Sequence, residues 1–160
     1  MVKRYLVFSS MIFAIFLIQA LLLVLPGDLT VANPFLALLV VLALKQGKTS
    51  GIVWGFILGV SFDALTMPQV GFHGVAFMVS GYFLGWVGTR FLLRGYIPLF
   101  LFTLAAYFLD WLIVACLFLL FETTMPSPLA LPVVVGAVVT GAMAVGTGFL
   151  FDRIDRGGKR

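Results

Sequence analysis

Three ionisable side chains, Asp63, His73 and Asp110, occur in stretches of sequence that are otherwise almost entirely apolar. Two carboxyls and an imidazole can share protons, form buried hydrogen bonds or hold a polar ligand. They make a poor zinc site, because His73 is the only histidine and the only cysteine, Cys116, lies in the middle of an apolar run. No close carboxylate pair, flanked nucleophile or phosphate loop accompanies them. We therefore expect no catalytic residue, no metal and no cofactor.

Three roles are open to this trio, because an ionisable group at membrane depth usually faces a partner or a cavity. In the first, Asp63 accepts hydrogen bonds from backbone N–H groups or from His73, across the turn at residues 67–71. In the second, the trio contacts another protein, and in the third it binds a proton or a small ligand. No Lys or Arg shares the predicted depth, so His73 is the only cationic partner that the chain offers.

The composition requires a membrane around most of the chain. Of the 160 residues, 62% are hydrophobic and only 10% are charged. A soluble domain of this length has too little interior to bury so much apolar surface. The net charge of +4 comes from basic residues in separate loops, which indicates attraction to anionic lipid and no nucleic-acid binding. We predict one all-α integral-membrane domain, residues 1–160.

The positions of the basic residues predict how the chain crosses the membrane. Apolar segments predict six transmembrane helices, at residues 5–25, 31–44, 49–66, 72–89, 96–121 and 129–151. Lys and Arg occur only at every second gap: Lys3 and Arg4, then Lys45 and Lys48, then Arg90 and Arg94, and last Arg153, Arg156, Lys159 and Arg160. Basic flanks stay in the cytoplasm, so both termini are expected there. Segment 31–44 is short for a span and begins with a helix-start pair, Asn33 and Pro34.

On these segments Asp63 and Asp110 each lie 14 residues beyond a cytoplasmic start, at Thr49 and Tyr96. A helix rises 1.5 Å per residue, so both carboxyls are expected about 21 Å along their helices, in the outer half of the membrane. His73 enters the membrane from the outer turn. The three side chains are therefore expected in one layer near the outer surface.

Small residues recur every four positions on three of the predicted helices. The repeats are Gly51, Gly55 and Gly59, followed in register by Asp63; Gly81, Gly85 and Thr89, with Phe77 and His73 extending the same register; and Gly136, Thr140, Ala144 and Gly148. A spacing of four residues keeps them on one slowly winding helix face. Small residues let helix backbones approach closely in a membrane, so each stripe either packs inside the bundle or receives a partner's helix.

A Gly-x-x-x-Gly helix that ends in Asp is followed here by a short turn, a Gly-Phe-His step and a Gly-Tyr-x-x-Gly helix. This order resembles the rod shape-determining protein MreD family, and it extends over about thirty residues. The length of the chain, six crossings and a short basic tail are similar as well. The positions that carry the resemblance are Gly55, Gly59, Asp63, Pro68, Gly71, His73, Gly81 and Gly85.

The resemblance implies a non-enzymatic component of the complex that builds lateral peptidoglycan, in the bacterial cytoplasmic (inner) membrane. The partner it implies is the transmembrane helix of MreC and, indirectly, RodA, a class B penicillin-binding protein and MreB; a homodimer within the complex is a further option. The family is similar in fold to the S-components of energy-coupling-factor transporters. The alternative function is therefore small-molecule (vitamin) binding, although the chain has few polar residues to line such a pocket.

Overall fold

Every element that the computed structural model describes is an α-helix. The described residues are 14–19, 21, 32–66, 71–90, 95–121 and 130–157. Residues 14–19 are helical and belong to the first apolar segment. The other helices are α2 (Pro34–Gln46), α3 (Lys48–Thr66), α4 (Phe72–Arg90), α5 (Tyr96–Leu120) and α6 (Ala130–Gly157).

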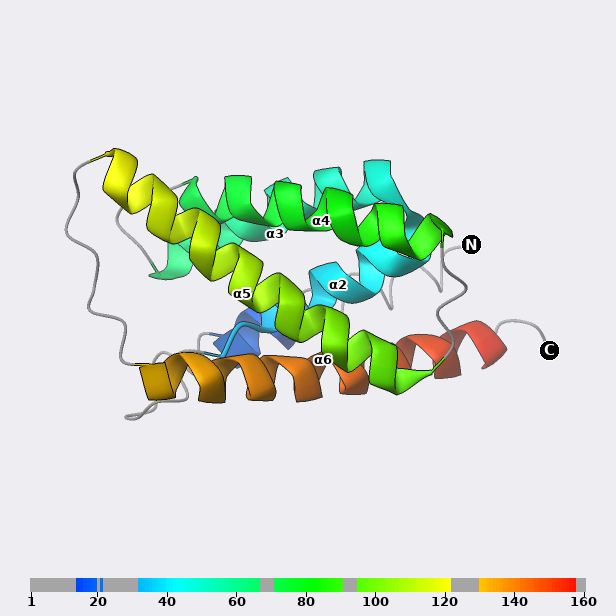
Figure 1. The fold of residues 1–160 in the computed structure, drawn as a ribbon. Coiled ribbons are helices and arrows are strands. Elements are labelled where there is room, and N and C mark those ends of the chain that lie inside the picture. The colour runs from blue at the N-terminus through cyan, green and yellow to red at the C-terminus, as the bar shows by residue number, and fades with distance from the viewer. Residues whose placement is uncertain are drawn as a thin grey trace.

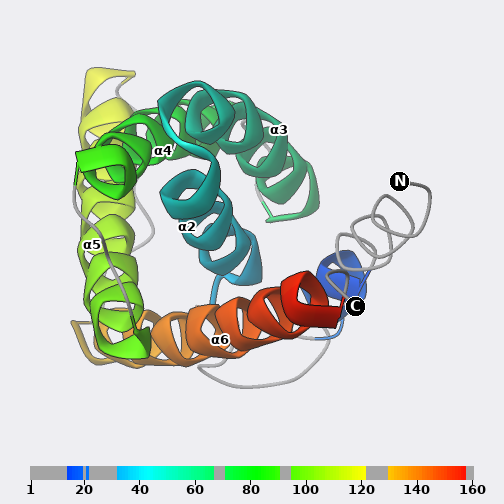
Figure 2. The ribbon, with the colours of Figure 1, turned by 90° about the vertical axis from the view of Figure 1, so that its right-hand side faces the viewer.

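The helices surround α2. Seen end-on, α2 lies in the centre, with α3 and α4 on one side, α6 on the opposite side and α5 between them (Figure 2). The side view shows that α5 runs diagonally, from α6 at its first residues to α4 at its last (Figure 1). The first half of α5 therefore packs on α6, where Leu99 and Phe100 lie against Gly148 and Gly141. Its second half packs on α4.

The burial of α2 explains how a short helix fits into this bundle. The Asn33 side chain accepts a hydrogen bond from the Leu36 N–H at 3.0 Å, and Pro34 occupies the first turn, as the sequence predicts. Every residue from Pro34 to Ala43 is buried. With 13 residues the helix is about 20 Å long at 1.5 Å per residue, well short of a hydrocarbon core of about 30 Å. Other helices, rather than lipid, therefore surround most of it.

Three of the described helices are long and apolar enough to cross a membrane: α3, α5 and residues 133–153 of α6. The predicted segments 49–66, 72–89 and 96–121 coincide with α3, α4 and α5 to within one residue at each end. Helix α4 is as long as α3, with 19 residues, but is not among the three helices that are long and apolar enough to cross. Helix α6 continues six residues beyond the predicted end at 151. The first span, 5–25, lies mostly outside the described residues.

Helices α3 and α4 form a tightly packed antiparallel hairpin. A Cβ atom added to Gly51, Gly55 or Gly59 would come closer than 3.0 Å to the backbone of Gly81, Phe77 or His73, respectively. As the glycine advances by one step of four residues along α3, its neighbour on α4 moves back by the same step. The stripes on α3 and α4 therefore face each other inside the bundle, and their backbones touch, as internal packing requires.

The described basic side chains all lie at one end of the bundle, which we call the basic end. Helices α2 and α6 finish there, joined by the Lys45–Asp152 ion pair at 2.6 Å, and α3 begins there with Lys48. Arg90 ends α4 at the same place, and Arg153 follows Asp152 on α6. The opposite end, which we call the far end, has no Lys or Arg among the described residues.

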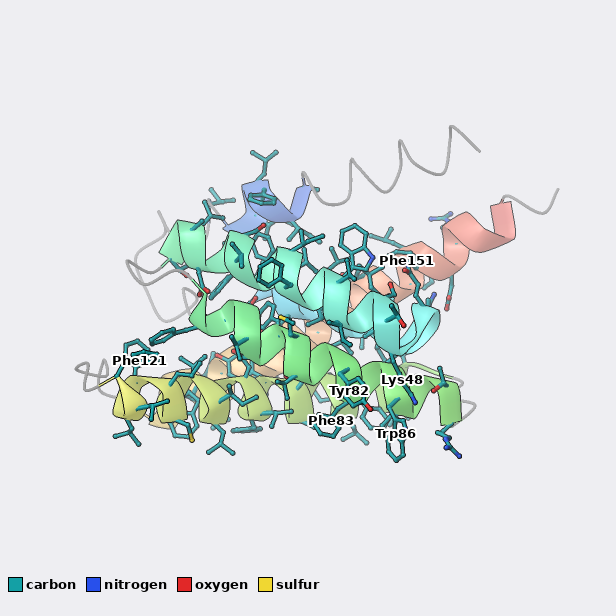
Figure 3. All side chains as sticks on the ribbon, turned by 90° about the horizontal axis from the view of Figure 1, so that it is seen from above. Lys48, Tyr82, Phe83, Trp86, Phe121 and Phe151 are labelled. Carbon is teal, nitrogen blue, oxygen red and sulfur yellow. The ribbon has the colours of Figure 1, made fainter. Side chains whose placement is uncertain are left out.

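Aromatic side chains of α4 project from the surface near the basic end. Figure 3 shows Phe83 and Trp86 pointing away from the bundle, with Tyr82 and Lys48 close by. At the far end Phe121 stacks on Phe72 at the start of α4, with ring centroids 5.6 Å apart. Rings of α4 and α5 therefore meet at the far end.

Candidate functional site

The carboxylate of Asp63 caps the N-terminus of α4. One oxygen, Oδ2, accepts hydrogen bonds from the backbone N–H groups of Gly71 at 2.8 Å, His73 at 3.1 Å and Gly74 at 3.3 Å. The first N–H groups of a helix have no partner within the helix, and their combined dipole favours a negative charge. An acidic side chain from α3 thus supplies the cap that the sequence at the start of α4 lacks.

The ring of His73 makes a second contact with the same carboxylate. His73 Nδ1 lies 2.7 Å from Asp63 Oδ1. A carboxylate that already accepts backbone N–H groups acts only as an acceptor, so Nδ1 carries the proton of this hydrogen bond. Both side chains are buried, and Asp63 is fully excluded from the surface. The pair therefore joins α3 to α4 at the far end.

Asp110 approaches His73 from the other side. Its Oδ2 lies 3.7 Å from His73 Nε2, which is an ion-pair distance but too long for a hydrogen bond. Asp110 is 6% exposed, and its other oxygen, Oδ1, has no hydrogen-bond partner. Helices α3, α4 and α5 each contribute one residue to this cluster, which we call the Asp–His–Asp cluster.

Local backbone structure sets up the cluster. Gly71 has a φ of +117°, a conformation that L side chains rarely adopt, and this directs its N–H toward Asp63. Asp63 lies in the last turn of α3, so its side chain reaches the start of α4. Around the imidazole, the Phe62 and Phe77 rings lie at centroid distances of 4.8 Å and 6.0 Å. Apolar rings thus keep the cluster in a dry environment, where each polar contact is strengthened.

The structure brings together most of the residues singled out from the sequence. Asp63, His73 and Asp110 meet in one layer, and Gly71 contributes an N–H to it. Gly51, Gly55 and Gly59 face α4, while Gly81 faces Gly51 and Gly85 faces Gly47. Pro68 lies outside the described residues. In the stripe on α6, Thr140 accepts a hydrogen bond from the Asn33 N–H at 2.9 Å, which fastens α6 to the start of α2.

Sequence reasoning missed two buried polar side chains that make no hydrogen bond. The amide of Gln19, in the first apolar segment, and the hydroxyl of Ser80, on α4, are both buried without a hydrogen-bond partner. A single polar residue within an apolar run was the available signal, since such residues usually face the bundle interior. Gln19 lies one turn after Ile15, which belongs to the core around α2.

The chemistry open to the Asp–His–Asp cluster is hydrogen bonding and the sharing of a proton. It holds one imidazole between two carboxylates, and Asp110 has one oxygen still free to accept. The described His, Cys, Asp and Glu residues form no group suited to a metal ion.

Comparison of the chain with protein-family models, with curated proteins and with solved structures gave no match. The function is therefore inferred from the residues and their geometry.

Proposed function

We propose that this chain is a non-enzymatic membrane scaffold of the bacterial elongation complex, similar to MreD. It binds the transmembrane helix of MreC in the cytoplasmic membrane. Through MreC it helps to position RodA and a class B penicillin-binding protein on the outside relative to MreB on the inside.

One observation supports this proposal above the others: the described residues of the resemblance lie together as a single structural unit. Asp63 caps the helix that begins after Gly71 and also binds His73, while Gly55 and Gly81 hold the two helices in contact. The order Asp, turn, Gly, His is thus what the hairpin needs to close its far end. A rigid hairpin of this kind suits a protein that holds others in place.

In this proposal the basic end faces the cytoplasm, and six crossings place both termini there. Lys and Arg are retained on the cytoplasmic side of a membrane. Tyr82 and Trp86 lie near that end, and such rings prefer the level of the lipid headgroups. In the same proposal the buried helix α2 lies in the second crossing, although its 13 residues alone are too few to span the membrane.

This orientation is tested with single cysteines in a Cys116→Ser background. Phe121→Cys, at the exposed far end, is expected to react with a membrane-impermeant thiol reagent in intact spheroplasts. Lys48→Cys and Arg90→Cys, at the basic end, are expected to react only after the membrane is permeabilised. Labelling of Lys48→Cys from outside, with Phe121→Cys protected, would overturn the orientation.

Partner binding is tested by co-purification. After solubilisation in a mild detergent, tagged protein is expected to retain full-length MreC, and to retain no unrelated single-span protein expressed at the same level. The same sample is then heated with a panel of vitamins, because a ligand bound to the folded state raises the melting temperature by mass action. Stabilisation by one compound, together with no recovery of MreC, contradicts the scaffold and supports the S-component alternative.

A further inference from the structure

His73 stands between two carboxylates that belong to different helices. Its Nδ1 is 2.7 Å from Asp63 on α3, and its Nε2 is 3.7 Å from Asp110 on α5. The first contact lies within the α3–α4 hairpin, which is already held by backbone packing along its length. The second contact is a polar link between that hairpin and α5.

The two ring nitrogens of His73 have different hydrogen-bonding roles. Because Nδ1 donates its proton to Asp63, a neutral His73 presents a lone pair at Nε2. A lone pair that faces an ionised Asp110 inside the bundle is repelled by it, and the Oδ1 atom of that carboxylate has no hydrogen-bond partner. One additional proton removes the conflict, whether it rests on Nε2 or on Asp110 Oδ2, because either arrangement gives a donor facing an acceptor.

We propose that the Asp–His–Asp cluster is a proton-binding site, and that the bound proton locks the far half of α5 onto the α3–α4 hairpin. The proton comes from the aqueous phase and lies between His73 Nε2 and Asp110 Oδ2. It changes the formal charge of the cluster from −2, with both carboxylates ionised and the ring neutral, to −1. When the proton leaves, α5 loses its polar link to α4. This inference does not depend on the identity of the protein's partners.

Among the described residues around the cluster, no Lys or Arg offsets the negative charge of Asp110, so a proton has to offset it. Asp63 faces the ring from α3, and Tyr107 lies near Asp110 on α5 as the other titratable group. Helix α2 contributes only apolar side chains from Phe35 to Ala43. The described side chains of α6 carry charge only at Asp152 and Arg153, at the basic end. No described Lys or Arg therefore reaches the cluster.

Apolar side chains also join α4 to the far half of α5. Val114 and Phe118 pack against Ala76, and the Phe72 and Phe118 rings lie 5.2 Å apart. In a membrane, lipid can replace such contacts at little cost, since no hydrophobic effect drives apolar helices together there. The polar link at His73 is thus the contact whose loss frees this part of α5.

The first test uses the fact that the chain has one histidine. With ¹⁵N-labelled histidine in a lipid nanodisc, every imidazole signal belongs to His73. As the pH falls, the Nε2 signal is expected to change from that of a free lone pair to that of a nitrogen bearing or receiving a proton, while Nδ1 stays protonated. A free lone pair at Nε2 at every pH at which the protein is folded would overturn the proposal.

The second test follows α5 itself. Phe72→Cys and Phe118→Cys are combined in a Cys116→Ser background, and disulfide formation is measured at pH values on either side of the Nε2 transition. Thiol oxidation itself depends on pH, so a reference variant is needed. The reference has the same two cysteines and also carries Asp110→Asn, whose amide donates to Nε2 without an added proton. At each pH, the rate of disulfide formation is divided by the rate in this reference variant. This ratio is expected to fall several-fold when the proton leaves. An unchanged ratio means that α5 is not locked by the proton and contradicts the proposal.

Discussion

Gly55→Leu is expected to prevent α3 and α4 from packing and to cost at least about 3 kcal/mol, the upper end of what overpacking a core costs. A Cβ at this position would come closer than 3.0 Å to backbone atoms of Phe77 and Met78, which cannot rotate away as a side chain does. The helices must separate along their whole contact. The measurement is the fraction of protein recovered monodisperse in mild detergent, and the melting temperature of that fraction.

Gly146→Leu is the matched control. Gly146 also lies inside a helix, but a Cβ there would meet nothing within 4 Å. The same chemical change is therefore expected to leave the melting temperature close to that of the parent, or to raise it slightly, since glycine is a poor helix former. Equal recovery and stability of the two variants would show that close backbone packing is not what holds α3 to α4.

Asp63→Ala is expected to destabilise the protein by about 3 kcal/mol or more, because several buried donors lose their acceptor at about 1–3 kcal/mol each. It leaves the N–H groups of Gly71, His73 and Gly74 without an acceptor and removes the partner of His73 Nδ1. Asp63→Asn is expected to cost much less, about 1–2 kcal/mol, because the amide oxygen still accepts the backbone N–H groups. Its NH₂ group then faces Nδ1, so the ring must move its proton to Nε2.

Thermal unfolding of the two variants in detergent, together with cell shape in a rod-shaped host, separates a structural role from a functional one. Asp152→Asn is the control, because its pair with Lys45 is exposed at the basic end and such pairs contribute about 0–1 kcal/mol. If Asp63→Ala is no less stable than Asp152→Asn, Asp63 is not the cap of α4. Rounded cells from a stably folded Asp63→Asn variant would indicate that the charge itself serves the complex.

The contact between Asp63 and His73 could be expected from the sequence because both lie next to one short turn. The stripes on α3 and α4 were similarly informative: a spacing of four residues on each side of a turn places the two glycine faces opposite each other. The three-residue layer with Asp110 followed from counting residues along two helices. The distance of 3.7 Å between His73 and Asp110 did not, because it depends on the diagonal course of α5.

The position of α2 was not available from the sequence. A helix that faces lipid and a helix enclosed by protein are both apolar on every side, so composition does not separate them. The number of residues between Asn33 and Gly47 was the one signal, since 13 helical residues are too few for a span. Gly47 and Gly88 were also overlooked, because their backbone neighbours, Gly85 and Leu44, become neighbours only when α2 and α4 come together.

The glycine stripe of α3 repeats every four residues, so the glycines alone do not fix how α4 is aligned along α3. The Asp–His–Asp cluster has a second consequence, for that alignment. If α4 slid along α3 by one repeat, about 6 Å, a glycine of α3 would again lie opposite a residue of the α4 repeat. The glycines of α3 therefore leave room for close approach in more than one alignment. The α3 stripe contains one Asp, Asp63. Its carboxylate can accept hydrogen bonds from the N–H groups of Gly71, His73 and Gly74 in only one alignment of the two helices. The buried carboxylate thus selects the register of the hairpin, as a lone polar residue does in a coiled coil.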